Sequence, residues 1–336
     1  MRDKGITYDT GFRPGGVSSR PRFDADTAAR ELRVIAEDLH CDAVRITGDD
    51  PHRLAIAARL AADVGLRVWF SPFPTELTAE EMLPFLATCA RSAEELRRDG
   101  ADVVFVAGCE VSMFAAGFLP GDTVHERIAN LATADLAALA DVPARVNDFL
   151  TRAAADTRAV FGGPISYAAG PWEDLDWSPF DIVTVDAYRD VRNAANFREL
   201  LAGVFRHGKP VAIGETGCAT YRGAADRGGM GWAILDRTVS PPMLDGDYVR
   251  DEDEQVRYLR DLLPIAEAAG VESFFWFTFA NYHMPHRPTP PRADLDLGSF
   301  GVVRVLDGAR GTAYPDMTWE PKKSFHALAE AYAARA

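Results

Sequence analysis

Segments that favour strands alternate with segments that favour helices along almost the whole chain. The expected strands are short apolar runs at 5–9, 43–47, 67–71, 103–110, 164–167, 181–188, 209–217 and 273–279. Apolar residues at helical spacing, such as those within 26–40 and 51–64, separate most of these runs. Regular alternation of this kind indicates βα units that build a parallel sheet.

Eight strands with helices between most of them fit the length of a single (β/α)8 TIM barrel, an α/β fold, in a chain of 336 residues. We expect one catalytic domain over 1–336, because the sequence shows no linker, internal repeat or low-complexity tract. Two long segments, roughly 219–247 and 280–317, follow the seventh and eighth strands and are rich in Gly, Pro and Asp. Such loops lie on the rim that carries the site, so we expect them to shape it.

Composition limits the partners of this protein. The chain has 36 basic and 50 acidic residues, a formal net charge of −14, which would repel a phosphate backbone and disfavours nucleic acid. No run of 18 apolar residues predicts a membrane span, and the N-terminus has no apolar leader, so we expect a cytoplasmic protein. The four cysteines are scattered without a CxxC pair and are expected to be free thiols.

Two glutamates each end one of the apolar strands. Glu110 closes the run 103–110, and Glu215 lies near the end of the run 209–217. A carboxylate at the end of a buried strand costs stability unless it has partners or a function. In a parallel barrel that end of the strands is the functional rim. Two carboxyl groups on one rim are the minimum equipment for cleaving a glycosidic bond.

Alternation along each strand predicts which side chains face the barrel interior. The expected inward sets are Val104, Val106, Gly108 and Glu110 on the fourth strand, Thr184, Asp186 and Tyr188 on the sixth, Val211, Ile213 and Glu215 on the seventh, and Phe274, Trp276 and Thr278 on the eighth. If both glutamates face inward, Tyr188 and Trp276 face the same cavity.

With these motifs the chain resembles clan GH-A, the retaining glycoside hydrolases with (β/α)8 barrels whose two catalytic glutamates end strands four and seven. The stretch Gly214-Glu215-Thr216-Gly217 resembles the nucleophile strand of that clan, and Cys109-Glu110 stands where the clan has Asn-Glu. The resemblance therefore implies that Glu215 is the nucleophile and Glu110 the acid/base.

The resemblance also implies roles for three surrounding residues. Tyr188 matches the strand-six tyrosine that hydrogen-bonds the nucleophile, Trp276 the strand-eight tryptophan under the sugar, and Arg45 the strand-two arginine that supports the nucleophile. Two further residues are candidates from their positions alone. Trp172 lies in a rim loop and is suited to stack on a sugar, and Asp9 ends the first strand, where it would line the pocket.

Cys109 is the main departure from the clan. The asparagine of the clan binds the 2-hydroxyl of the sugar, whereas a thiol is a weak donor and a weak acceptor. Hydrogen bonds to that hydroxyl stabilise the transition state of retaining enzymes. Either the substrate is not an ordinary 2-hydroxy sugar, another residue supplies the contact, or activity is low or lost.

Other chemistries lack their usual residues. The sequence has no HxH pair of the kind that binds a metal, no GxGxxG dinucleotide motif after the first strand, and no GxSxG nucleophile elbow. We therefore expect neither a metal nor a cofactor. The leading hypothesis is a retaining glycoside hydrolase or transglycosidase that acts on a small-molecule or oligosaccharide glycoside. A non-catalytic carbohydrate- or metabolite-binding barrel, and a tailoring enzyme that uses the two glutamates on a non-sugar substrate, are the alternatives. No motif indicates the sugar, the linkage or the oligomeric state.

Overall fold

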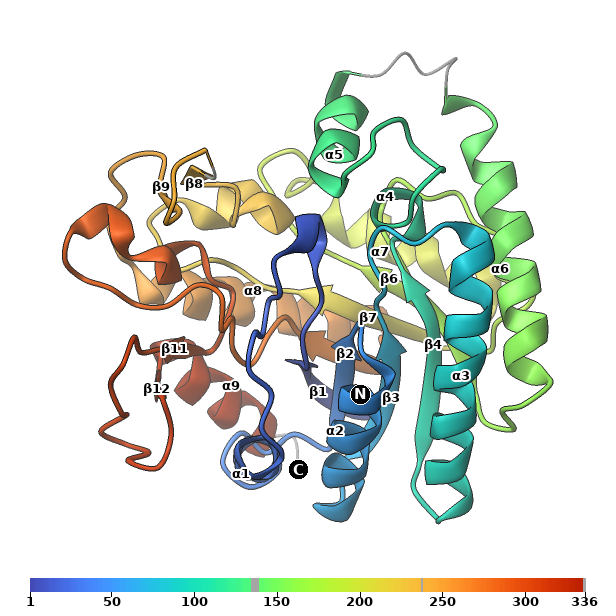
Figure 1. Cartoon of the computed structure of the whole chain (residues 1–336), viewed down its shortest axis with the longest axis horizontal. Coiled ribbons are helices and arrows are strands. Elements are labelled where there is room, and N and C mark those ends of the chain that lie inside the picture. The colour runs from blue at the N-terminus through green and yellow to red at the C-terminus, as the bar shows by residue number, and fades with distance from the viewer. Residues whose placement is uncertain (134–138, 237, 335–336) are drawn as a thin grey trace.

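A closed barrel of eight parallel strands forms the centre of the computed structural model, which describes residues 1–133, 139–236 and 238–334 (Figure 1). The order around the barrel is β1-β10-β7-β6-β5-β4-β3-β2. These strands are β1 (Asp3–Asp9), β2 (Ala43–Gly48), β3 (Arg67–Pro72), β4 (Val103–Cys109), β5 (Ile165–Ala169), β6 (Val183–Asp186), β7 (Val211–Thr216) and β10 (Ser273–Trp276). The predicted (β/α)8 barrel is therefore confirmed.

Helices connect most of the strands and cover the outside of the barrel (Figure 1). They are α1 (Ala25–Glu37), α2 (Pro51–Asp63), α3 (Ala79–Arg98), α4 (Val111–Phe114), α5 (Val124–Thr133), α6 (Val142–Arg158), α7 (Phe197–Val204), α8 (Glu252–Ala269) and α9 (Lys323–Ala333). Local sequence explains where several begin. Thr78 and Glu81 form the expected capping box before α3, and Pro51 occupies the first turn of α2. Part of the long helical region expected after Asp122 lies outside the described residues.

The inward faces of the seventh and eighth barrel strands differ from the expectation. Val104 and Val106 pack inside the barrel as expected, together with Trp69, Ala212 and Phe275. The residues predicted to face inward at 211, 213, 274 and 276 instead pack in the outer core under the helices. Both faces of these strands are buried, so their apolar pattern alone does not distinguish the inner face from the outer one.

Bulges on β4 and β7 bring their ends back toward the interior. The register of β4 against β5 shifts between Val106 and Cys109. On β7, Ile213 pairs with Val185 and Glu215 with Asp186, which leaves Gly214 as the extra residue. A Cβ atom at Gly214 would lie 2.8 Å from Asp186 Oδ1, so the bulge needs glycine there. An extra residue reverses the alternation, which is how bulges re-aim side chains beside functional sites.

The two long rim segments contain short elements of their own. The segment after β7 carries η4 (Ala224–Met230) and the hairpin of β8 (Leu235–Asp236) and β9 (Met243–Leu244). The segment after β10 carries η5 (Pro291–Ala293), η6 (Leu295–Gly298) and the pair β11 (Val303–Val305) and β12 (Trp319–Pro321). The sequence predicts that the last helix begins near 320–321, but these residues belong to β12 and the helix begins at Lys323. Among the described helices, none is both long and apolar enough to cross a membrane.

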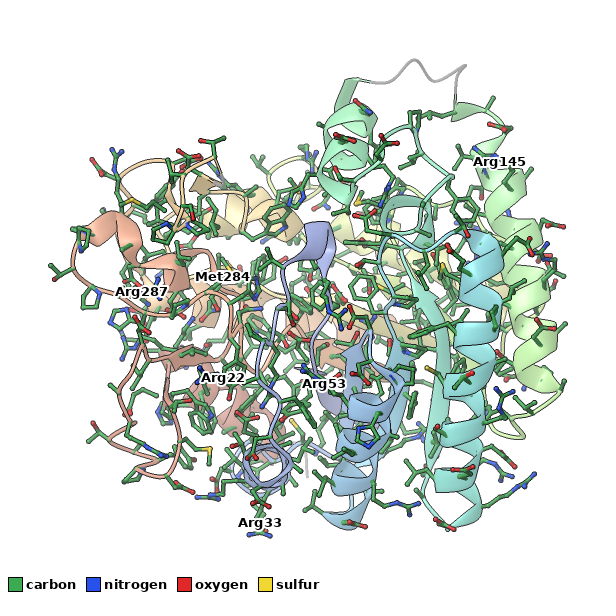
Figure 2. All side chains as sticks on the ribbon, in the orientation of Figure 1. Arg22, Arg33, Arg53, Arg145, Met284 and Arg287 are labelled. Atoms are coloured by element: carbon green, nitrogen blue, oxygen red, sulfur yellow. The ribbon has the colours of Figure 1, made fainter. Side chains whose placement is uncertain are left out.

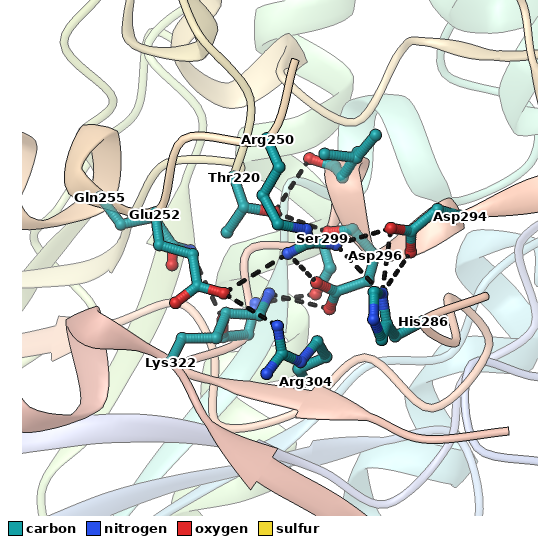
Figure 3. Close-up of polar contacts among 12 residues, drawn as sticks. Thr220, Arg250, Glu252, Gln255, His286, Asp294, Asp296, Ser299, Arg304 and Lys322 are labelled. Atoms are coloured by element: carbon teal, nitrogen blue, oxygen red, sulfur yellow. Dashed lines mark hydrogen bonds and ion pairs between the residues drawn. The ribbon is translucent and has the colours of Figure 1, made fainter. Parts of the chain in front are cut away.

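A network of charged side chains ties these two segments together (Figure 3). Arg250, just before α8, donates to Asp296 Oδ2 at 2.8 Å and to Asp294 Oδ2 at 3.0 Å. Lys322 Nζ lies 2.8 Å from Asp296 Oδ1, and His286 Nδ1 lies 2.9 Å from Asp294 Oδ1. Burial alone would raise the pKa of Asp294, but Arg250 and His286 together lower it below its ordinary value. The network holds both long segments on the rim of the barrel.

Candidate active site

The structure brings five of the expected residues to one cavity at the carboxyl ends of the strands. Glu110 follows β4 directly, Glu215 lies on β7, and both line a cavity of about 340 Å³. Cys109, Tyr188 and Trp172 line the same cavity. Its volume is near the lower end of small-molecule pockets, which span roughly 300–1,000 Å³.

Glu110 has a left-handed backbone, with φ 43° and ψ 45°. This conformation is unfavourable for a residue with a Cβ atom, so the surrounding structure must hold it. The Glu110 amide donates to the Ala168 carbonyl at 2.9 Å, and the next amide, of Val111, donates to the Tyr167 hydroxyl at 2.7 Å. These contacts fix the sharp turn from β4 into α4 that carries the Glu110 side chain at the cavity.

Glu173 supports this turn from the loop after β5. The Tyr167 hydroxyl lies 2.9 Å from Glu173 Oε2, and Ser112 donates to Glu173 Oε1 through its hydroxyl at 2.6 Å and its amide at 3.1 Å. The indole of Trp172 donates to the Ser112 hydroxyl at 3.1 Å. Glu173 therefore links the Glu110 turn to the aromatic side chain at the cavity rim. Sequence reasoning missed this residue, because a single loop glutamate carries no distinguishing pattern.

Arg45 and Tyr188 hold the two oxygens of Glu215 separately. Arg45 is fully buried, and its Nη1 donates to Glu215 Oε1 at 2.9 Å and to the Gly214 carbonyl at 3.1 Å. Its Nε donates to the hydroxyl of Ser71 on β3 at 3.1 Å. The Tyr188 hydroxyl donates to Glu215 Oε2 at 3.1 Å. Burial, followed by the charge of Glu215, raises the pKa of Tyr188, so this hydroxyl remains a donor. The Glu215 carboxylate is thereby fixed in orientation.

Cys109 and Asp186 lie beneath the glutamates. The sulfur of Cys109 is 3.5 Å from Asp186 Oδ2 and 3.9 Å from Glu215 Oε1. Burial, and then Asp186 and Glu215, raise the pKa of Cys109, so it is a thiol rather than a thiolate. One ligand atom from each of these three residues fits within 4.8 Å of the others, a spacing that suits a metal ion. However, a ligating cysteine must be a thiolate, and the Arg45 guanidinium already supplies the positive charge at 2.9 Å from Glu215 and 3.8 Å from Asp186.

The electrostatics of the two glutamates differ. Burial, and then the charges of Asp186, Glu215 and Glu173, raise the pKa of Glu110 well above its ordinary value. Such surroundings favour the protonated form of a carboxyl group. Glu215 instead has an arginine and a phenol as its donors, which suits a carboxylate. The site thus combines a buried carboxyl group whose pKa is raised with a second carboxyl group that is held by two donors.

Three expected site residues do not line the cavity. Arg45 is buried behind the cavity and contacts one of its lining residues, Glu215. Asp9 is buried, its carboxylate accepts from the Gly11 amide at 2.7 Å, and burial raises its pKa to about 6. The expectation that Trp276 faces the cavity is wrong: Trp276 is fully buried in the outer core, where its ring packs edge-on against Tyr258. Because β10 alternates, the next residue, Phe277, lines the cavity instead.

Thr47 also lines the cavity, and sequence reasoning missed it. It lies on β2, two positions after Arg45, so both side chains share a face of the strand. Its hydroxyl is buried at the cavity, and within the described residues it has no hydrogen-bond partner. The period-two spacing from Arg45 is the signal that would have found it.

Comparison with known proteins identifies the fold of this chain but does not assign it to a family. No family model matches the sequence, and no curated protein matches it. Solved structures do match over the whole chain. A GH113 β-1,4-mannanase aligns with a TM-score of 0.64 at 15% identity, covering 100% of both chains. The GH113 β-mannanase AaManA from Alicyclobacillus acidocaldarius gives 0.60 at 16% identity, covering 100% of this chain and 98% of the other.

A family 1 β-glucosidase from Thermotoga maritima aligns with a TM-score of 0.56 at 13% identity, covering 99% of this chain and 97% of the other. All three structures are (β/α)8 barrels of clan GH-A. The chain has the fold of clan GH-A. Sequence identities of 13–16% show a shared fold and nothing more. Any inference about the reaction must therefore come from the residues that line the cavity.

Proposed function

We propose that this protein is a retaining glycoside hydrolase or transglycosidase that acts by double displacement. The observation that carries the proposal is the contrast between the two glutamates of one cavity. Glu215 is held at both oxygens by Arg45 and Tyr188, whereas burial and negative neighbours raise the pKa of Glu110 and favour its protonated form. This division of roles is the one that glycosidic bond cleavage uses.

In the first step, Glu215 attacks the anomeric carbon while Glu110 gives its proton to the departing glycosidic oxygen. The bond to the leaving group breaks, an ester bond to Glu215 forms, and the aglycone leaves as an alcohol. In the second step, Glu110, now a carboxylate, takes a proton from water or from an acceptor alcohol. That oxygen displaces Glu215, so the product keeps the original configuration. This mechanism predicts about 5–5.5 Å between the two carboxyl groups.

Cys109 favours a second candidate, a barrel that binds a carbohydrate or metabolite without cleaving it. Its thiol lies against Asp186 and Glu215, where it offers a sugar hydroxyl a weaker partner than an amide would. The Thr47 hydroxyl is a candidate to supply the contact to the sugar that Cys109 makes weakly, because Thr47 lines the cavity and its hydroxyl has no protein partner in the described structure.

A tailoring enzyme that acts on a non-sugar substrate would use the same two carboxyl groups.

Intact-mass measurement after incubation with a panel of 2-fluoro glycosides tests the proposal. The expected result is one covalent glycosyl adduct, located on Glu215 by peptide mapping and absent from Glu215→Gln. In Glu110→Ala, hydrolysis of an unactivated glycoside should fall at least about 1000-fold. With an activated aryl glycoside, whose departure needs no acid, azide should restore turnover of this variant and give a glycosyl azide of retained configuration. Glu199→Gln, an exposed glutamate on α7, is the matched control and should behave as wild type.

Full activity in Glu215→Gln or Glu110→Ala would rule out the assigned roles. Sugar binding by calorimetry without hydrolysis across the panel would favour the non-catalytic barrel. Turnover of a non-sugar substrate without any glycosyl adduct would favour the tailoring enzyme.

A further inference from the structure

Apolar side chains make up much of the cavity lining around the two glutamates. Phe12 and Phe73, from the loops after β1 and β3, and Phe114 of α4 form a continuous aromatic row with ring centroids 5.0 and 4.8 Å apart. Val124 and Ile128 of α5 extend this wall. One side of the cavity is therefore an apolar surface contributed by the segments that follow β1, β3 and β4.

The opposite wall is also apolar. Phe277 and Phe300 pack edge to face with centroids 6.0 Å apart, and the Tyr188 ring packs edge to face against Phe300 at 5.9 Å. Met230 and Met284 complete this side of the cavity, and Figure 2 labels Met284 on the loops that follow β10. Methionine side chains adapt to ligands of irregular shape, which suits an apolar group of variable outline.

Several polar side chains at the cavity edge already serve the protein itself. The carboxylate of Asp190 accepts from Arg192 Nε at 2.9 Å, and Asn193 Nδ2 donates to the Tyr188 carbonyl at 2.9 Å. The side-chain oxygen of Asn281 accepts from the Ser299 hydroxyl and the Phe300 amide, both at 3.0 Å. The atoms that make these hydrogen bonds are therefore already paired, which leaves fewer polar atoms for the hydroxyls of additional sugar rings.

This distribution distinguishes two kinds of leaving group. A second or third sugar ring would bring several hydroxyls against the apolar walls, and each unpaired hydroxyl would cost free energy. An aromatic or aliphatic group would instead gain from being removed from water. The Thr47 hydroxyl, which is buried and has no partner in the described structure, belongs to a residue that lines the same cavity as the two glutamates.

We propose that the substrate is a glycoside of a bulky apolar alcohol, with one sugar at the glutamates and the apolar aglycone between the two aromatic walls. This inference rests on the proposed glycosidase function and adds the class of substrate. It separates the protein from its structural neighbours that are named mannanases, because the leaving group here is not a sugar.

The test compares alkyl glycosides of increasing chain length. A panel of 4-nitrophenyl glycosides first identifies the sugar, and kcat/KM is then measured for methyl to octyl glycosides of that sugar and for its trisaccharide. Burial of each methylene between apolar walls should raise kcat/KM about threefold, so the octyl glycoside, with four more methylenes, should exceed the butyl glycoside by roughly 80-fold. The octyl glycoside should also exceed the trisaccharide. A flat dependence on chain length, or a preference for the trisaccharide, would overturn the inference.

Two variants link this preference to the cavity wall. Ile128→Asn places an amide on the α5 wall and should reduce the octyl-to-butyl ratio to below about tenfold. Leu200→Asn makes the same change on α7 at a residue that is 52% exposed and does not line the cavity, and it should leave the ratio unchanged. Equal ratios in Ile128→Asn and wild type would count against the assigned wall.

A binding measurement separates failure of this inference from failure of the glycosidase proposal. Trp172 and Trp232 line the cavity, so their fluorescence should respond to non-hydrolysable methyl and octyl thioglycosides. If no glycoside is cleaved but the octyl compound binds at least about tenfold more tightly, the apolar preference holds and the catalytic proposal fails. If glycosides are cleaved but both compounds bind equally, the catalytic proposal holds and the apolar preference is overturned.

Discussion

Replacing Arg45 with methionine would expose the repulsion between two buried carboxyl groups. Arg45 Nη1 lies 2.9 Å from Glu215 Oε1 and 3.8 Å from Asp186 Oδ1, and the side chain is fully buried. Oxygens of Asp186 and Glu215 lie within 4.8 Å of each other. At an effective dielectric constant of about 20, two full charges at that separation repel by about 3.5 kcal/mol. We therefore expect Arg45→Met to lower the free energy of unfolding by about 3–5 kcal/mol at pH 8.

The pH dependence of this loss identifies its cause. Burial, and then the charge of Glu215, raise the pKa of Asp186 well above its ordinary value, and removal of Arg45 would raise it further. Between its unfolded and folded pKa values, this carboxyl group binds more protons in the folded state, so the stability of the variant rises as the pH falls. The loss relative to wild type, measured at each pH by urea denaturation, should shrink by roughly half between pH 8 and pH 5.

Two further variants complete the test. Adding Asp186→Asn to Arg45→Met removes one of the opposed charges and should recover about 2–3 kcal/mol at pH 8. Arg45→Lys retains the charge, and its stability relative to wild type should depend little on pH. An Arg45→Met loss that is the same at both pH values, and that Asp186→Asn does not reduce, would mean that Arg45 acts through packing and that the electrostatic account is wrong.

Three predictions concern catalysis on an activated aryl glycoside. Tyr188→Phe removes the hydroxyl that donates to Glu215, so kcat should fall roughly tenfold to 100-fold with little change in KM, and an unchanged kcat would contradict this role. Asp186→Asn removes a negative neighbour that raises the pKa of Glu110, so the alkaline limb of the kcat/KM profile should move to lower pH; a shift to higher pH would refute the assignment. Cys109→Asn supplies a stronger hydrogen-bonding group, so kcat/KM should rise about tenfold for a 2-hydroxy glycoside but not for the matching 2-deoxy glycoside, and equal changes for both would count against this contact.

Much of the architecture was accessible from local sequence. The eight apolar runs, the capping box at Thr78 and the first-turn proline at Pro51 depend on residues that lie close together in the chain. The same holds for the placement of Glu110 and Glu215 at strand ends. Because parallel strands with helical crossovers bring their carboxyl ends to one rim, the sequence was enough to predict that both glutamates meet there.

Only the tertiary structure decided which side chains enter the cavity. Bulges on β4 and β7 and the register of β10 against its neighbours determine that Glu215 and Phe277 face inward while Trp276 faces outward. The support of the Glu110 turn by Glu173 likewise joins separate loops. When a strand is apolar on both faces, its own residues do not indicate which face is inside, because that choice depends on hydrogen-bond register with strands distant in sequence.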